Sequence, residues 1–321
     1  MSAISGTVEH AAGASGERNP ARTKDSARNR VVVFGDIIDD IVVVPEGPIR
    51  QDTDTPSSIR NRAGGSAANA ASWLADLGAG VDFVGRVAAE DVQRHSAILE
   101  SFGVTPHLIG DTEHPTGTIV VLVDGNNRSM LTERGANAFL SADDVADDLL
   151  DHASVVHFTG YSVFDSADHS PVRRLIERAT ARGVTVSVDP ASAGNLDDFG
   201  TEAFLDVIAG AGMLFPNLDE GRALTGLDVP EDMAAALADR VPLVALTLGT
   251  GGVVVAERGH EAVRVAAQES AIVDPTGAGD SFTAGFLAAW ITGADAVAAA
   301  KSGVQVAARA VATVGGRPPK Q

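Results

Sequence analysis

One stretch near the C-terminus decides how the rest of the chain is read: Val273-Asp274-Pro275-Thr276-Gly277-Ala278-Gly279-Asp280-Ser281-Phe282. Three small residues precede a carboxylate and an apolar run at helical spacing, which is typical of a loop that turns into a helix. Free backbone N–H groups at a helix start, with the helix dipole behind them, form a site for an anion. Asp280 would repel that anion unless it accepts a proton, so the stretch indicates a base beside a phosphate, as in phosphoryl transfer to a hydroxyl. The alternative is an acid that only complements the helix dipole.

Composition restricts the class of protein. A chain of 321 residues fits one large α/β domain with an appendage. Its apolar runs end after about five to eight residues, so they predict buried strands and no membrane segment. A net charge of −19 disfavours a nucleic-acid partner, and the absence of Cys excludes thiolate catalysis and Cys-ligated zinc.

Lysine is scarce, with only Lys24, Lys301 and Lys320, and no Gly-Lys-Ser/Thr sequence of a Walker-type loop is present. Backbone amides, Arg and a metal must therefore carry any phosphate chemistry. Residues 1–28 lack the apolar block of a secretory signal and predict a disordered tail. We expect a cytoplasmic protein whose folded domain spans residues 29–321.

A second informative stretch begins at a glycine pair, Gly64-Gly65, and continues as a helix of small residues that ends at Gly78. Asn69 lies in the first turns of this helix, on a face otherwise made of Ala, where a ligand that approaches the helix start would meet it. Before this stretch, Asp39 and Asp40 separate two apolar runs. Asp40 is either a solvated turn residue or a carboxylate that binds ligand hydroxyls.

The chain predicts two sheets. From Ser141 onward, helices and strands alternate, which indicates a mainly parallel sheet with helices on both faces and ligands beyond the carboxyl ends of its strands. Two runs around Asp124-Gly125-Asn126-Asn127 predict a hairpin, which we pair with the strand after Asp40 as a small β lid, formed by about 41–62 and 114–134. Expected strands are 31–35, 81–85, 116–123, 128–132, 155–158, 184–189, 213–215, 244–248, 252–256 and 262–265. Expected helices are 91–102, 142–150, 171–182, 202–209, one that opens at Asn217, and 294–312.

Asn217 and Glu220 join a strand end to a helix start. Their spacing predicts a capping box, and the same oxygens suit a water-mediated Mg²⁺ site.

The chain resembles the ribokinase-like (PfkB) carbohydrate kinases over about Val31 to Gly316. The stretch from Ala63 to Asn69 is similar to the first signature of that family, and Asp274 to Asp280 is similar to the second. Asn-x-x-Glu and Thr-Leu-Gly stand between them in the order of the family. The joint occurrence is far more specific than either motif alone.

The resemblance implies a three-layer α/β fold with a β lid, and transfer of the γ-phosphoryl group of ATP to a hydroxyl of a small sugar such as ribose or a ketohexose, with Mg²⁺. The hydroxyl is expected to be primary. The resemblance implies that Asp280 is the base and that the amides of Gly277, Ala278 and Gly279 form an anion hole. It implies that the sugar is bound by Asp40, Gly64, Gly65 and Asn69, and the nucleotide by Asn217, Thr247, Gly249 and Gly279. It also implies water-mediated Mg²⁺ binding by Glu220 and, as in relatives activated by K⁺, monovalent-cation binding by Asp274 and Thr276. The lid of such proteins often forms a homodimer contact.

Two departures bear on the substrate. Ser66 stands where ribokinases usually have Lys, and Thr159-Gly160-Tyr161 stands near the place of their acidic sugar-binding residue. Three alternatives therefore stay open. The first is a nucleoside kinase, which would need an aromatic platform. The second is a 2-keto-3-deoxygluconate kinase, in which Arg128 or Arg134 pairs with the carboxylate. The third is a catalytically silent sugar-binding regulator.

Overall fold

The structure is a computed structural model that describes residues 29–124, 127–164, 166 and 168–319. The predicted tail, residues 1–28, lies outside the described residues. Within them, no helix has the length and apolar character of a membrane span.

The main sheet has nine strands in the order β13-β12-β11-β10-β9-β8-β1-β4-β5. All neighbouring strands are parallel except β12, which is antiparallel to both β11 and β13. The mainly parallel sheet is therefore confirmed. The strands are β1 (Arg30–Phe34), β4 (Gly80–Ala88), β5 (Val104–Asp111), β8 (Ala153–Thr159), β9 (Thr185–Asp189), β10 (Met213–Leu214), β11 (Leu243–Thr247), β12 (Val253–Glu257) and β13 (Val263–Val265).

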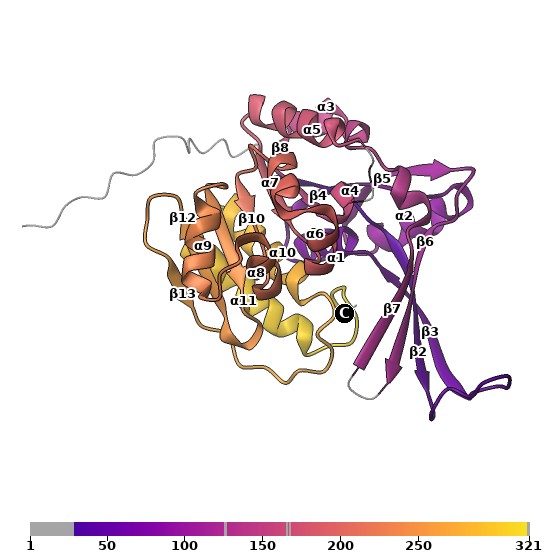
Figure 1. Ribbon diagram of the computed structural model, residues 1–321. Helices are drawn as coiled ribbons and strands as arrows, with labels where there is room; N and C mark the ends of the chain where they lie inside the picture. The colour runs from indigo at the N-terminus through magenta and orange to yellow at the C-terminus, as the bar shows by residue number, and fades with distance from the viewer. Residues whose placement is uncertain (1–28, 125–126, 165, 167, 320–321) are drawn as a thin grey trace, which may run out of the picture.

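Two hydrophobic cores, one on each face of this sheet, make the three layers (Figure 1). Strand β1 shows the division, because Val32 and Phe34 belong to one core while Val31 and Val33 belong to the other. One face is covered by α1 (Ser66–Asp76), α2 (Val92–Glu100), α10 (Ala278–Ile291) and α11 (Ala296–Val311). The other face is covered by α3 (Asp147–Asp151), α5 (Ser170–Ala181), α6 (Ala193–Phe199), α7 (Thr201–Val207), α8 (Leu218–Thr225) and α9 (Pro230–Ala238).

The structure differs from the local predictions in several places, and helices α6 and α9 are among the elements that the sequence pattern does not predict. The single helix over 142–150 is wrong, because Ser141 caps a short 3₁₀ turn, Ala142–Asp144, and extended backbone at Val145 and Ala146 separates that turn from α3. The short helix α4 (Tyr161–Phe164) is not predicted by the sequence pattern. Nor is β5, whose Pro106 is tolerated because β5 is an edge strand.

The second sheet has four strands in the order β3-β2-β6-β7 and projects from the main body (Figure 1). They are β2 (Ile38–Pro45), β3 (Ser57–Gly64), β6 (Gly117–Asp124) and β7 (Asn127–Glu133). Strands β2 and β6 are parallel, and the other pairs are antiparallel. The sequence predicts the β6–β7 hairpin and its pairing with β2. It does not predict β3, which lies in the polar segment between residues 45 and 64 and lacks an apolar alternation.

Candidate active site

Three cavities meet at the start of α10. The first, of about 1410 Å³, lies between the small sheet and the main body. The second, of about 1260 Å³, lies beside α11 and the loop after β11. A smaller one, of about 280 Å³, shares Gly277 and Asp280 with the first and Ala278 and Gly279 with the second. The stretch 277–280 therefore stands between two spaces that are each large enough for a ligand.

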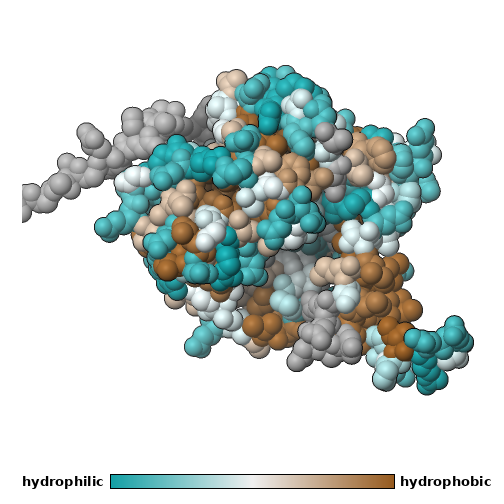
Figure 2. Space-filling view, in the orientation of Figure 1, coloured by the Kyte–Doolittle hydropathy of each residue, from teal (hydrophilic) through white to brown (hydrophobic). Residues whose placement is uncertain are grey.

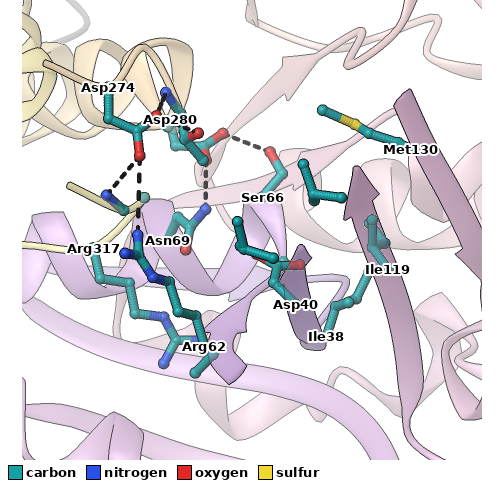
Figure 3. Close-up of a pocket in the computed structure, with 18 of the residues that line it drawn as sticks. Ile38, Asp40, Arg62, Ser66, Asn69, Ile119, Met130, Asp274, Asp280 and Arg317 are labelled. Carbon is teal, nitrogen blue, oxygen red and sulfur yellow. Dashed lines mark hydrogen bonds and ion pairs between the residues drawn. The ribbon is translucent and has the colours of Figure 1, made fainter. Parts of the chain in front are cut away.

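Asp280 is the third residue of α10 and is held by two side chains of α1. The Ser66 hydroxyl donates to one of its carboxylate oxygens at 2.6 Å, and the Asn69 amide donates to the other at 2.9 Å (Figure 3). Burial raises the pKa of Asp280 to about 6, and the charges of Asp36 and Asp40 act in the same direction. The carboxylate is thus oriented, and its pKa is close to that of a base that works near neutral pH.

The backbone before Asp280 forms the turn that the sequence predicts. Gly277 has φ 74°, in the left-handed region that favours glycine, and it is the N-cap of α10 without any side-chain cap. The Ala278 amide already donates to the Pro275 carbonyl at 3.2 Å. Ala278 and Gly279 border the same two cavities, and the Gly279 amide is the better placed for an anion because that of Ala278 is already paired.

Three of the four residues predicted to bind substrate line the first cavity. Asp40, on β2, borders it with Gly65 and Asn69. Gly64 packs against Asp40, since a Cβ at Gly64 would lie within 2.6 Å of that carboxylate. Burial raises the pKa of Asp40 to about 6, while the charge of Arg317 lowers it.

The sequence analysis does not single out Asp36, although it lies two residues after the end of β1. Its carboxylate accepts the backbone N–H groups of Ser66 at 2.9 Å and Ala67 at 3.1 Å. It therefore fixes the start of α1, the helix that carries both side chains holding Asp280.

Asn217 and Glu220 form the predicted capping box at the start of α8. Glu220 is 2% exposed and accepts the Asn217 backbone N–H at 2.9 Å and its side-chain amide at 2.7 Å. Burial raises the pKa of Glu220 to about 7. Burial, together with the charges of Glu220 and Asp280, also raises the pKa of Asp189.

Asp189, Glu220 and Asp280 all line the small cavity. Three carboxylates around one confined space are stabilised by a divalent cation, and oxygen donors are the ligands that Mg²⁺ prefers. Mg²⁺, which keeps several of its waters, therefore fits this cavity through water-mediated contacts with these carboxylates. Asp189 was missed as a member of the group because sequence spacing does not show that β9 ends beside α8 and α10.

The predicted nucleotide-binding residues lie on the far side of Asp280. Thr247 ends β11, and Gly249 begins a 3₁₀ turn, Gly249–Gly251, with φ 56°. Both line the second cavity, and Thr247 with Asn217 also lines the small one. One end of a ligand bound in the second cavity would therefore reach Gly279 and the small cavity.

Asp274 and Thr276, expected to hold a monovalent cation, are joined to each other. One Asp274 oxygen accepts the Thr276 amide at 3.0 Å and its hydroxyl at 2.7 Å. The other accepts the Gly315 amide at 3.0 Å and lies 3.9 Å from an Nη of Arg62. Donors and a guanidinium surround this carboxylate, so the arrangement does not fit a bound cation, and we derive no step through one.

Other side chains that border the first cavity include an aromatic ring and a buried arginine. They are Tyr161, over whose ring the Arg134 guanidinium lies at 4.6 Å, and the buried Arg317. The side chain of Arg128 lies outside the described part of the chain.

Comparison with known proteins agrees with this geometry. The model of the pfkB family carbohydrate kinases matches residues 28–321. This chain belongs to the pfkB family of carbohydrate kinases. The resemblance and the fold expected from the two motifs are thereby confirmed, and the chain is an ATP-dependent sugar kinase.

Two similar relatives of this pfkB kinase are curated proteins. An ATP-dependent 6-phosphofructokinase of Thermoanaerobacterium thermosaccharolyticum is 25% identical over 281 residues, which cover 84% of each chain. An ATP-dependent ribose-1-phosphate kinase of Halopiger xanaduensis is 31% identical over 252 residues, covering 76% of this chain and 79% of the relative. Among solved structures, adenosine kinase from Sinorhizobium meliloti is 27% identical with a TM-score of 0.80, over 91% of this chain and 96% of that one.

Proposed function

We propose that this pfkB kinase transfers the γ-phosphoryl group of ATP to a hydroxyl of a small sugar, with Asp280 as the base. The observation that carries the proposal is the place of Asp280 where the first cavity meets the small one. The sugar occupies the first cavity and is bound by Asp40, Gly64, Gly65 and Asn69. ATP occupies the second cavity, along Thr247 and Gly249, with its phosphates directed toward Asn217 and Gly279.

The reaction then proceeds by one displacement. The sugar oxygen forms a bond to the γ-phosphorus, the bond from that phosphorus to the β–γ bridging oxygen breaks, and ADP leaves. The hydroxyl proton passes to Asp280. The N–H groups of Gly277, Ala278 and Gly279 at the start of α10 stabilise the developing negative charge, Gly279 most directly. Mg²⁺, held through water by Glu220 with Asp189 nearby, supplies charge neutralisation when it is bound.

Replacement of the base tests this mechanism. In Asp280→Asn, kcat should fall about 10²–10⁴-fold, because proton transfer is lost while the hydrogen-bonding shape is kept. Turnover is measured as ADP release over a panel of sugars and nucleosides. Asp232→Asn, an exposed residue of α9, is the matched control. Near-normal turnover of folded Asp280→Asn would show that the base assignment is wrong.

A nucleoside acceptor is the second candidate, because the adenosine kinase structure is similar to this chain. The lining of the first cavity argues against it: its only aromatic side chains among the described residues are Phe102 and Tyr161. Adenosine as the best acceptor in the panel would overturn the sugar assignment. If no acceptor led to ADP release, the alternative of a catalytically silent sugar-binding regulator would be favoured.

Three finer expectations stay proposals. The small sheet acts as a lid and as the contact of a homodimer, and the protein is cytoplasmic. The expected K⁺ site at Asp274 and Thr276 stays a prediction. The hydrogen-bond donors around the Asp274 carboxylate argue against it. Equal turnover in K⁺ and in Na⁺ buffers would remove it.

A further inference from the structure

Four arginines line the first cavity together with four aspartates, which are Asp36, Asp40, Asp274 and Asp280. The arginines come from three separate parts of the chain: Arg60 and Arg62 from β3, Arg134 from the end of β7, and Arg317 from the C-terminal segment. In a chain with 43 acidic and 24 basic side chains, this concentration of guanidinium groups around one cavity needs a reason.

Arg317 supplies the sharpest observation. It is 9% exposed, and its Nη2 donates to the Gly64 carbonyl at 3.0 Å. Its Nε and Nη1 are buried without a hydrogen-bond partner among the described residues. Burial lowers the pKa of Arg317 to about 10, so it stays charged at neutral pH. A buried guanidinium with unpaired N–H groups is costly unless an acceptor reaches it.

Arg60 and Arg62 extend this basic region along the small sheet. Arg60 and Arg62 lie on the same face of β3, where they pair with Val42 and Asp40 of β2. All four residues line the cavity. The nearest acidic partner of Arg62 is Asp274, at 3.9 Å, and Arg60 has no ion pair within the part of the chain that the structure describes. Arg94 and Arg182, by contrast, each contact two carboxylates within 3.0 Å.

The cavity therefore has two chemically different ends. Asp280 marks the end where the hydroxyl reacts, and Asp40 lies opposite Arg62 in the sheet register. Figure 3 shows Asp280 beside Ser66 and Asp274, the guanidinium of Arg62 directed toward Asp274, and Arg317 below Asn69. A sugar whose hydroxyl faces Asp280 and whose ring hydroxyls face Asp40 presents its remaining end to the arginines.

We propose that the acceptor is a phosphorylated sugar, whose phosphate ester is bound by Arg60, Arg62 and Arg317 while a free hydroxyl faces Asp280. The three terminal oxygens of a phosphate dianion match guanidinium donors that arrive from three positions, whereas a carboxylate offers only two oxygens. This inference rests on the proposed function, since it names the class of its acceptor.

The test compares sugars with their phosphate esters. The wild-type enzyme is assayed for ADP release with ribose and ribose 5-phosphate, with fructose and fructose 6-phosphate, and with gluconate as a sugar acid. The phosphate esters should have the higher kcat/KM. In Arg60→Gln, the ratio of kcat/KM for ester over free sugar should fall about tenfold or more, as expected for a lost charged hydrogen bond. Arg50→Gln, exposed in the loop after β2, should keep the wild-type ratio.

Calorimetric binding of the same esters without ATP separates the two proposals. Ester binding that weakens in Arg60→Gln supports the phosphate site even if no acceptor is turned over, a result that would defeat only the proposed function. An equal or higher kcat/KM for free sugars, or for gluconate, overturns the phosphate site and leaves the kinase assignment standing. Arg317→Gln is a second variant; Arg60 keeps the test decisive if loss of the buried arginine prevents folding.

Discussion

The carboxylate of Asp280 should set the acid limit of the reaction. Its pKa of about 6 means that at pH 5 only about one-tenth of the molecules carry the ionised base. We expect kcat/KM to fall about tenfold per pH unit below 6, and more steeply where Asp40, with a similar pKa, also titrates. A profile of kcat/KM from pH 4.5 to 8 checks this. A rate that is flat down to pH 4.5 would contradict it.

Ser66 affects the pH below which Asp280 becomes protonated. Its hydrogen bond to Asp280 stabilises the ionised form and lowers the pKa of Asp280. Ser66→Ala should therefore move the acid limb of kcat/KM to higher pH. Ser101→Ala, at the exposed end of α2, should leave the limb where it is. An unmoved limb in Ser66→Ala would show that this contact does not act on the base.

Asp280 also costs stability at neutral pH. Its pKa is higher in the folded chain than its ordinary value of 3.8, so the folded state holds the proton more tightly. The contribution of Asp280 to the free energy of unfolding is most favourable below about pH 4 and is lost as the pH rises through about 6. Asp280→Asn should be more stable than wild type at pH 7, by on the order of 2 kcal/mol, with the difference shrinking toward pH 4. Urea unfolding at both pH values measures this, and a destabilised variant at pH 7 would contradict it.

The turn before α10 depends on the absence of a side chain. A Cβ at Gly277 would lie 2.7 Å from the Gly316 Cα and 2.8 Å from its carbonyl oxygen. Gly277→Ala should lose stability through left-handed strain of about 1–2 kcal/mol, and should also lose activity because α10 and Asp280 shift. Gly259→Ala has a similar φ of 80° with no atom within 4 Å of the Cβ, so it should show the strain alone. Equal activity in the two folded variants would contradict the argument.

Local patterns predicted the parts of the site that are local. The turn before Asp280 and the capping box of Asn217 and Glu220 depend on neighbouring residues, so the sequence shows them. The contact of Ser66 with Asp280 joins residues 214 positions apart, and only the packing of α1 on α10 creates it. Strand β3 was missed because its cavity-facing residues, Ser58, Arg60 and Arg62, are polar. Arg60 and Arg62 were missed with it, whereas Arg134 was predicted as a possible partner of a substrate carboxylate.

The small sheet has apolar side chains on both of its faces, which matters for the assembly of the molecule. Met130 faces the first cavity, while Ile59 and Leu131 are 62% and 60% exposed and do not line it. Figure 2 shows apolar residues gathered on this sheet at the lower right. Exposed apolar surface of this kind marks an interaction site.

If this sheet forms a homodimer contact, Leu131→Glu should shift the molecule to a monomer. Light scattering coupled to size exclusion at micromolar concentration measures the mass, with Val229→Glu on the main body, 49% exposed, as the control. A wild-type monomer at these concentrations would remove the lid dimer.

The three cavities share lining residues at 277–280, which has a consequence for inhibitor design. A single compound that joins a sugar to adenosine through a chain of phosphates would fill all three spaces at once. Once one half is bound, the other is held near its own cavity at millimolar effective concentration. Such a compound should bind more tightly than either half, and the best number of phosphates would measure the separation of the two substrates in solution.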